Sequence, residues 1–178
     1  MNTLELIRKR CSIRQYSSAP IEAEKVEYLL EAARLAPSAC NNQPWYFLVV
    51  TEEEGRLKIQ LSYSREWVKS VPLFIVLCGD HGQSWRRPAD GKDHLDLDAG
   101  IAIEHICLAA AEQDLGSCII CHFDVPLMHA AFHLPEQIEP LAIISLGYPE
   151  RPELFAQTPK RRKPAEEVVR WERFSAGS

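Results

Sequence analysis

The sequence lacks any long hydrophobic run, and it lacks the start of a secretory leader. No apolar stretch among the 178 residues approaches the roughly 20 residues needed to cross a bilayer. The first residues, MNTLE, show no basic segment followed by an apolar core. We therefore expect no membrane partner and a cytoplasmic location. A length of 178 residues suits one domain that spans residues 1–178.

A continuous basic face, which nucleic-acid binding requires, is also missing. The 25 acidic residues outnumber the 20 basic residues, which gives a net charge of −5. This charge is uneven, because residues 1–16 and residues 151–178 each carry +3 and the middle of the chain carries −11. We therefore expect no nucleic-acid partner for an acidic body with two basic ends.

Glycine-rich phosphate-binding motifs are absent as well, since neither G-x-G-x-x-G nor a P-loop occurs. Cationic side chains would have to hold a nucleotide phosphate instead. Arg10, Ser12 and Arg14 stand at alternate positions, so an extended segment would present them on one face. Two guanidinium groups around a hydroxyl suit a phosphate. Lys160 and Arg162 belong to a second basic block, although either block alone is more typical of a solvated surface than of a binding site.

The six cysteines include a C-x-x-C-H pattern at Cys118, Cys121 and His122. This pattern is typical of haem attachment, and with His129 and His133 it could also be read as a zinc site with an unusually short spacer. Both intervening residues are isoleucines in a β-type run, which favours a core strand whose residues three apart point to opposite faces. Haem, zinc and a redox-active pair remain open as alternatives.

Hydrophobic periodicity predicts helices and strands that alternate along the chain. Helices are expected at residues 3–9, 22–36, 52–62, 95–113 and 126–132. Strands are expected at residues 45–51, 71–78, 117–121 and 140–146, with a long loop at 80–94. The helix at 95–113 is apolar nearly all round, which indicates burial on several sides or a subunit interface. The class is α/β or α+β with a central sheet.

A block of small and amide residues joins the second of these helices to the first strand. Residues 36–45 read APSACNNQPW, with two prolines that fix the path of the chain. Small side chains let the backbone approach a flat ligand, and amide side chains offer both donors and acceptors to the edge of a heterocycle. The same features would also suit an ordinary turn.

Taken together, these blocks resemble the short members of the nitroreductase-like family of FMN-dependent oxidoreductases. The matching stretches follow in order over nearly the whole chain: RCSIRQY (10–16), EAARLAPSACNNQPWYFLVV (31–50), DLDAG (96–100), LGSCIICHFD (115–124), HLPEQIEPLAIISLGYPE (133–150) and PKRRKPAEEVV (159–169). The resemblance implies an α+β sandwich with a central mixed sheet flanked by helices. It also implies an intertwined homodimer, FMN between the subunits, and a tail at 150–178 that wraps the partner.

The activity that the resemblance implies is that of an FMN-dependent NAD(P)H oxidoreductase. NADH or NADPH would pass hydride through the flavin, in ping-pong fashion, to a nitroaromatic, quinone or similar small molecule. Flavin N5 would do the chemistry, Arg14 would tune it, and no metal is implied. The other positions carried over as cofactor ligands are Arg10, Ser12, Lys160 and Arg162 on the phosphate side, and Cys11, Pro37, Ser38, Ala39, Asn41, Gln43, Ile120 and Cys121.

Several positions depart from the family pattern. Cys11 stands where a second arginine is common, and Cys121 with His122 replaces a small residue. The Asn and Lys that often precede the third block are absent, although Arg65 or Lys69 could substitute. Related folds fragment flavin, dehalogenate aromatics or oxidise azoline rings, and a non-catalytic flavin-binding protein is a further alternative.

Overall fold

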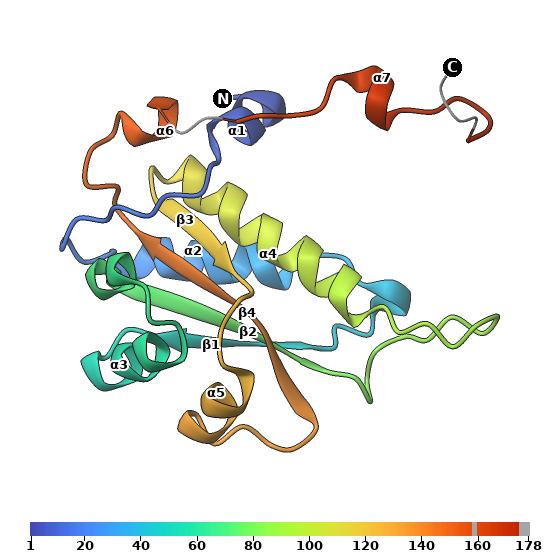
Figure 1. The fold of residues 1–178 in the computed structure, drawn as a ribbon, viewed down its shortest axis with the longest axis horizontal. Coiled ribbons are helices and arrows are strands. Elements are labelled where there is room, and N and C mark those ends of the chain that lie inside the picture. Colours follow the sequence, from blue (N-terminus) through green and yellow to red (C-terminus); the bar gives the residue numbers. More distant parts are fainter. Residues whose placement is uncertain (158–159, 175–178) are drawn as a thin grey trace.

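Four strands form a sheet at the centre of the molecule, in the order β1-β2-β4-β3 (Figure 1). All eight residues of β2 are buried, because elements pack against both faces of the sheet. A strand covered on both faces reads as a continuous apolar run, as this segment does. In this computed structural model, which describes residues 1–157 and 160–174, the strands are β1 (Trp45–Val50), β2 (Leu73–Asp80), β3 (Gly116–Ile120) and β4 (Ile138–Gly147).

The pairing differs from the mixed sheet that we expected. β2 pairs antiparallel with β1 and β4, and β3 pairs antiparallel with β4. Among the described residues, parallel pairing is limited to one isolated bridge between Ser12 and Ser117. This bridge sets the extended N-terminal segment against the edge strand β3. The α+β class itself is confirmed.

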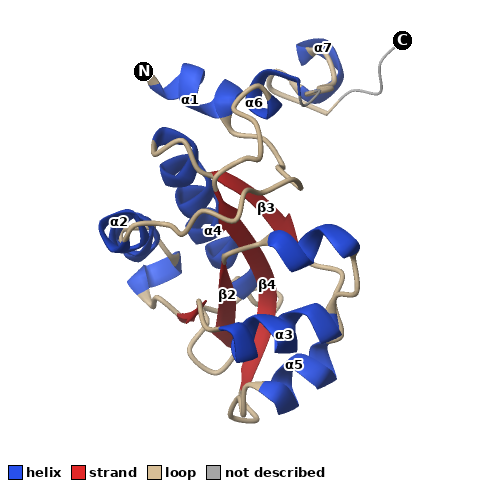
Figure 2. Ribbon diagram, turned by 90° about the vertical axis from the view of Figure 1, so that its left-hand side faces the viewer, coloured by secondary structure: helices blue, strands red, loops and turns tan. Residues whose placement is uncertain are grey.

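Two hydrophobic cores lie on the two sides of the sheet (Figure 2). The first joins α2 and α4 to the sheet, and the second joins α3 and α5 to its other face. Successive residues of β2 alternate between them, since Ile75 belongs to the first core and Phe74 to the second. The helices are α2 (Ala23–Arg34), α3 (Glu53–Ser62), α4 (Leu95–Glu112) and α5 (Val125–Ala131), with short 3-10 helices η1 (Ala39–Asn41) and η2 (Glu66–Ser70).

The helices predicted from periodicity are all present, and their ends agree within two residues. Differences concentrate at the ends because capping and turn geometry, not periodicity, decide where a helix stops. No helix among the described residues is both long enough and apolar enough to cross a bilayer.

One face of α4 stays uncovered in the single chain. Its Ala102, Ile106 and Cys107 are fully buried, whereas Leu97 is 60% exposed. The uncovered face forms a groove of about 490 Å³ that is lined by Asp96, Leu97, Gly100, Ile101, Glu104, His105 and Leu108. Burial of α4 on several sides is therefore only partly achieved within one chain.

α1 (Thr3–Lys9) and the C-terminal segment lie together at one end of the molecule, beyond the sheet (Figures 1 and 2). None of the residues of α1 is buried. The C-terminal segment carries α6 (Leu154–Gln157) and α7 (Ala165–Val168), and its Trp171 and Phe174 are 82% and 88% exposed. Large apolar side chains with this much exposure are unusual on a protein surface that remains in solvent.

Candidate functional site

The basic segment 10–14 runs extended along β3. The N–H of Ile13 donates a hydrogen bond of 2.9 Å to the carbonyl oxygen of Ser117, and the side chain of Ile13 is buried. Because side chains alternate along an extended chain, the side chains at positions 10, 12 and 14 face away from that core. Their exposure, partial at positions 10 and 12 and larger at position 14, agrees with the shared face expected from the sequence.

Cys11 is the predicted ligand in this segment whose side chain points into the core. It is 3% exposed, and its Sγ lies 3.9 Å from the carbonyl oxygen of Phe155. The same alternation that presents its neighbours turns this thiol into the core. Cys11 can therefore meet a ligand only through its backbone.

The two basic ends of the chain meet in the structure. The ammonium group of Lys160 donates to the carbonyl oxygens of Ile7 and Arg8, at 2.5 and 2.7 Å, near the end of α1. Burial lowers the pKa of Lys160, and the positive charges of Arg10 and Arg162 lower it further. Cations that disfavour one another in this way form a site that an anion stabilises.

Arg10 has unused hydrogen-bonding capacity. Its Nε lies 3.1 Å from Oε1 of Glu104, but this contact lacks hydrogen-bond geometry. This buried nitrogen has no hydrogen-bond partner among the described residues. Buried donors are normally paired, so the orphaned nitrogen indicates a place for an acceptor. A phosphate oxygen fits it, because arginine pairs well with phosphate.

Ser12 and Arg14 lie beside Cys118, in the middle of β3. Burial raises the pKa of the Cys118 thiol, while the charge of Arg14 and hydrogen bonds with Ser12 and Arg14 oppose that rise. Arg14 therefore places a positive charge beside the middle of β3.

β3 leads from Ser117, beside Ser12, to Ile120 and Cys121. At about 3.3 Å per residue, those four steps cover roughly 13 Å, so the strand can run beneath an extended ligand. Ile120 is 4% exposed, whereas Cys121 is exposed. Cys118 is buried, as expected if the two cysteines point to opposite sides. In the part of the chain that the structure describes, no group of three or more His, Cys, Asp or Glu side chains could hold a metal ion.

The small-residue loop before β1 is held together by its own side chains. The hydroxyl of Ser38 accepts the N–H of Gln43 at 2.9 Å, and the side-chain amide of Gln43 donates to two oxygens of Asn41 at 3.3 Å each. Cys40, Asn41 and Gln43 have positive φ, which few side chains other than Asn adopt readily. Pro37 is exposed at the start of the loop. The predicted ring-side ligands thus share one strained, solvent-facing loop.

Asp98 anchors this loop to α4, a role that the sequence did not reveal. Its Oδ1 accepts the N–H of Ala39 at 3.0 Å. Asp98 is 2% exposed, and its Oδ2 is buried without a hydrogen-bond partner among the described residues. Asp98 also lies in the first turn of α4, where a negative charge is favourable. The signal that could have found it is its place four residues before Ala102, on the apolar side of that helix.

The small-residue loop and the basic segment stay apart within one chain. Between them, no hydrogen bond or ion pair joins residues 37–43 to residues 10–14, all of which the structure describes. Asp98 contacts the loop and Glu104 contacts Arg10, and six residues of helix separate these two acids by about 9 Å. Within one chain, the small-residue loop and the basic segment are therefore connected only indirectly, through α4.

A cavity of about 760 Å³ opens directly after Cys121. It lies between the end of α3 and the start of α5. Its walls are Ser62, Tyr63, Ser64, Arg65, His122, Phe123, Asp124, Val125 and Pro126.

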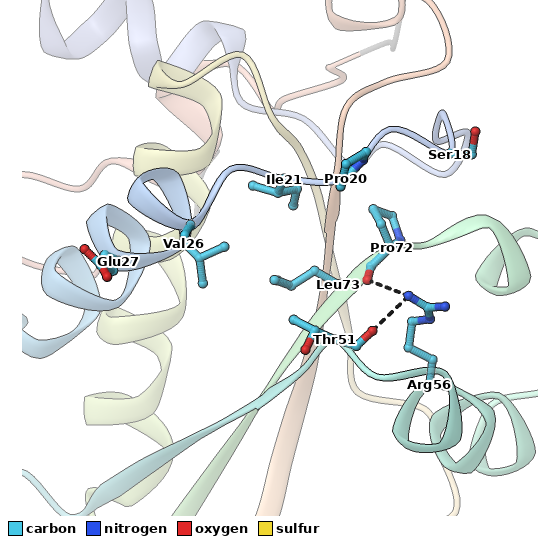
Figure 3. Close-up of a pocket in the computed structure, with 10 residues that line it drawn as sticks. Ser18, Pro20, Ile21, Val26, Glu27, Thr51, Arg56, Pro72 and Leu73 are labelled. Carbon is cyan, nitrogen blue, oxygen red and sulfur yellow. Dashed lines mark hydrogen bonds between the residues drawn. The ribbon is translucent and has the colours of Figure 1, made fainter.

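A second cavity, of about 520 Å³, lies at the opposite end of the sheet, where β1 ends and β2 begins (Figure 3). Arg56 borders it, but its Nη1 already donates to the carbonyl oxygens of Thr51 and Pro72, at 2.9 and 3.2 Å. None of the predicted ligands lines this cavity. We therefore leave it out of the candidate site.

Residues 80–94 form an arm whose base is a cluster of ionic contacts. His81 contacts Asp93 through Nδ1 at 2.9 Å and Glu139 through Nε2 at 2.6 Å, and Arg86 reaches Asp93 at 3.0 Å. Burial acts to raise the pKa of Asp93, but hydrogen bonds from a backbone N–H, from His81 and from a serine hydroxyl lower it to about 2. The arm also touches the small-residue loop, because the side chain of Asn42 donates to a carbonyl of the arm at 3.0 Å.

This cluster predicts a pH-dependent arm. Hydrogen bonds with Asp93 and Glu139 raise the pKa of His81 above its usual 6.5. The stabilisation from protonated His81 is therefore complete below pH 6.5 and disappears as the pH rises through the raised value. Tryptic cleavage in the arm, at Arg86, should become faster relative to that of a His81→Gln variant as the pH is raised from 6.5. A ratio of the two rates that does not change with pH would contradict this.

Comparison with known proteins gives a consistent result. A model described as the Nitroreductase family matches residues 7–72 and 61–148 of this chain. The crystal structure of a nitroreductase family protein from Clostridium difficile has a TM-score of 0.87 and 36% identity, covering 98% of this chain and 100% of its own.

Two further similar proteins have descriptions that state an activity or a bound ligand. An Archaeoglobus fulgidus protein, provisionally named an NADH dehydrogenase/NAD(P)H nitroreductase, is 32% identical over 90% of this chain and 93% of its own length. The crystal structure of a Desulfovibrio desulfuricans protein in complex with FMN has a TM-score of 0.81 and 26% identity, covering 98% of this chain and 99% of that one.

Proposed function

The chain belongs to the nitroreductase family, and from this premise we propose that it is an FMN-dependent NAD(P)H oxidoreductase. Electrons from NADH or NADPH reach a nitroaromatic, quinone or similar small acceptor in a ping-pong cycle. The observation that supports this most directly is the contact between the two basic ends of the chain, where Lys160 binds the carbonyl oxygens of Ile7 and Arg8 and feels the charges of Arg10 and Arg162. Such a cluster has the chemistry that a phosphate needs.

The cycle balances as a two-electron transfer. NAD(P)H loses a hydride to become NAD(P)⁺, and with one proton from solvent a nitro group becomes a nitroso group and water. When bound, FMN supplies the redox chemistry between these two half-reactions. The protein's part is to hold the phosphate, place the ring and exclude competing ligands.

The phosphate side is formed by one chain. Arg10 offers its guanidinium, whose Nε is near Glu104 but makes no hydrogen bond among the described residues, and Ser12 offers its hydroxyl. Lys160 is already oriented by two carbonyl oxygens at the end of α1. Arg14, beside Cys118, would supply positive charge to the cofactor when it is bound. Ile120 and Cys121 then meet the ring through their backbone groups.

We assign the ring side to a second copy of the chain, as the resemblance to the family implies. The loop that carries Pro37, Ser38, Ala39, Asn41 and Gln43 does not reach the basic segment of its own chain. A homodimer would bring this loop over the ring and cover the open face of α4. The exposed apolar residues of the tail at 150–178 would lie on the partner in such a dimer. We place the reaction in the cytoplasm, because six unpaired cysteines suit a reducing compartment.

The direct test is spectroscopic. The purified protein, as isolated or after incubation with FMN, should show the absorption of oxidised flavin. Anaerobic addition of NADH or NADPH should bleach that absorption, and a nitroaromatic or quinone should restore it. Titration with each nucleotide identifies the preferred one. Protein that takes up no FMN, or that keeps its flavin absorption with both nucleotides, would contradict the proposal.

A further inference from the structure

The cavity beyond Cys121 combines aromatic walls with a free cation. Tyr63 and Phe123 are half-buried, and Tyr63 packs edge-on against Trp67 with ring centroids 5.9 Å apart, which fixes its position. Val125 and Pro126 add apolar surface on the other side. These walls suit a flat aromatic molecule.

Arg65 is the free cation of this cavity. Its side chain is exposed and makes no hydrogen bond or ion pair among residues 1–157 and 160–174. The neighbouring acid, Glu66, is paired with Lys69 at 2.8 Å. An unpaired guanidinium at the edge of an apolar cavity can accept a carboxylate in a two-pronged contact.

One acid, Asp124, also lines this cavity, and its carboxylate is bound to the start of α5. The carboxylate of Asp124 accepts the N–H of Leu127 at 2.9 Å and caps α5. Its backbone N–H is bound to the carbonyl oxygen of Ser62 at 2.9 Å. Asp124 therefore caps α5 from within the cavity wall. His122 adds a second nitrogen-bearing side chain to this wall.

The cavity adjoins the segment that the ring would face, since His122 follows Cys121 directly. Resting on the function proposed above, we propose that the electron acceptor binds here and that it is an aromatic molecule bearing a carboxylate, held by Arg65. The acceptor's nitro or quinone group points toward Cys121 and the carboxylate toward Arg65. For a nitro acid, two electrons from NAD(P)H and two protons, one released from NAD(P)H as part of the hydride and one from solvent, give the nitroso acid and water.

The test compares 4-nitrobenzoate with 4-nitrobenzamide, which has nearly the same shape without the charge. The FMN-loaded wild-type enzyme should have a higher kcat/KM for the acid. Arg65→Gln should lower kcat/KM for the acid roughly tenfold or more, as expected for loss of a charged hydrogen bond, and should change the value for the amide less than twofold. Lys58→Gln is the matched control, because this cation lies on α3, is paired with Glu54 at 2.8 Å and does not line the cavity, so its loss should leave both values unchanged.

A binding measurement gives a readout that does not depend on turnover. Calorimetric titration of the FMN-loaded protein with benzoate, which is not reduced, should give a Kd that rises about tenfold in Arg65→Gln, while benzamide binding stays the same. Equal kcat/KM for acid and amide in the wild type would overturn the inference, and so would an equal loss for both in the variant. A weaker FMN Kd in Arg65→Gln would assign Arg65 to the cofactor and also overturn it.

The two proposals fail in different ways. If NADH and NADPH both leave the flavin oxidised, the proposed function fails and this inference fails with it. If the flavin is reduced and a neutral quinone is turned over without any preference for acids, only the inference about Arg65 fails.

Discussion

Replacing Arg10 by alanine should weaken FMN binding by roughly 10- to 150-fold, the equivalent of about 1.5–3 kcal/mol for one charged hydrogen bond. The reason is that Arg10 carries the buried nitrogen without a partner and stands where Lys160 and Arg162 add their charge. Titration of the apoprotein with FMN, followed by quenching of flavin fluorescence, measures the change. Raising the salt concentration should reduce the difference between the variant and the wild type, because the interaction is partly electrostatic.

Arg8→Ala is the matched control for this experiment. The Arg8→Ala substitution removes a charge of the same sign two positions earlier in the chain. The side chain of Arg8 is exposed, however, and only its backbone carbonyl contacts Lys160. Its variant should bind FMN within about threefold of the wild type, as expected for a surface charge. Equal Kd values for the Arg10→Ala and Arg8→Ala proteins would remove Arg10 from the phosphate site.

Gly116→Ala should lower stability by about 1–3 kcal/mol, the usual effect of overpacking a filled core. A Cβ at position 116 would lie 2.8 Å from Cβ of Ile13 and within 3.0 Å of both of its γ-carbons. The Cβ and γ-carbons of Ile13 lie next to its backbone and cannot swing aside as the flexible tip of a side chain could. The backbone of the basic segment must therefore move away from β3. The variant should therefore melt at a lower temperature and also bind FMN less tightly.

Gly100→Ala tests whether this effect belongs to the position and not to the substitution. A Cβ at position 100 meets nothing within 4 Å, and the residue lies within α4. Within one chain, alanine should stabilise this helix by up to about 1 kcal/mol relative to glycine. A loss of stability at this position would instead report on the α4 groove that a partner would cover. Thermal melts of the two apoproteins at one concentration provide the measurement. A Gly116→Ala protein as stable as the wild type would show that β3 does not hold the basic segment in place.

The sequence by itself determined the elements and the pattern of the basic segment. Residues 71–78 are a continuous apolar run, and a strand buried on both faces of a sheet needs such a run. The alternation of Arg10, Ser12 and Arg14 with buried neighbours predicted their shared face, because the period of an extended chain is two. These are local properties, which depend on residues a few positions apart.

The same local rule also accounts for the burial of Cys11. Alternation should have turned this thiol inward, yet the family pattern placed it among the ligands, and the structure buries it against Phe155. The sheet was expected to be mixed, but the direction in which strands pair depends on how the connections cross it. That property is not encoded in any single strand.

Only the tertiary structure decided how distant residues meet. Lys160 reaches the end of α1 across more than 150 positions, and Asp98 fixes the loop at Ala39 from 59 positions away. Only the fold brings residues 122–126 beside Arg65, so that they line one cavity with its guanidinium at the edge. Contacts of this kind arise when helices and strands pack to bury apolar surface, and the partners are chosen by the whole fold and not by the intervening sequence.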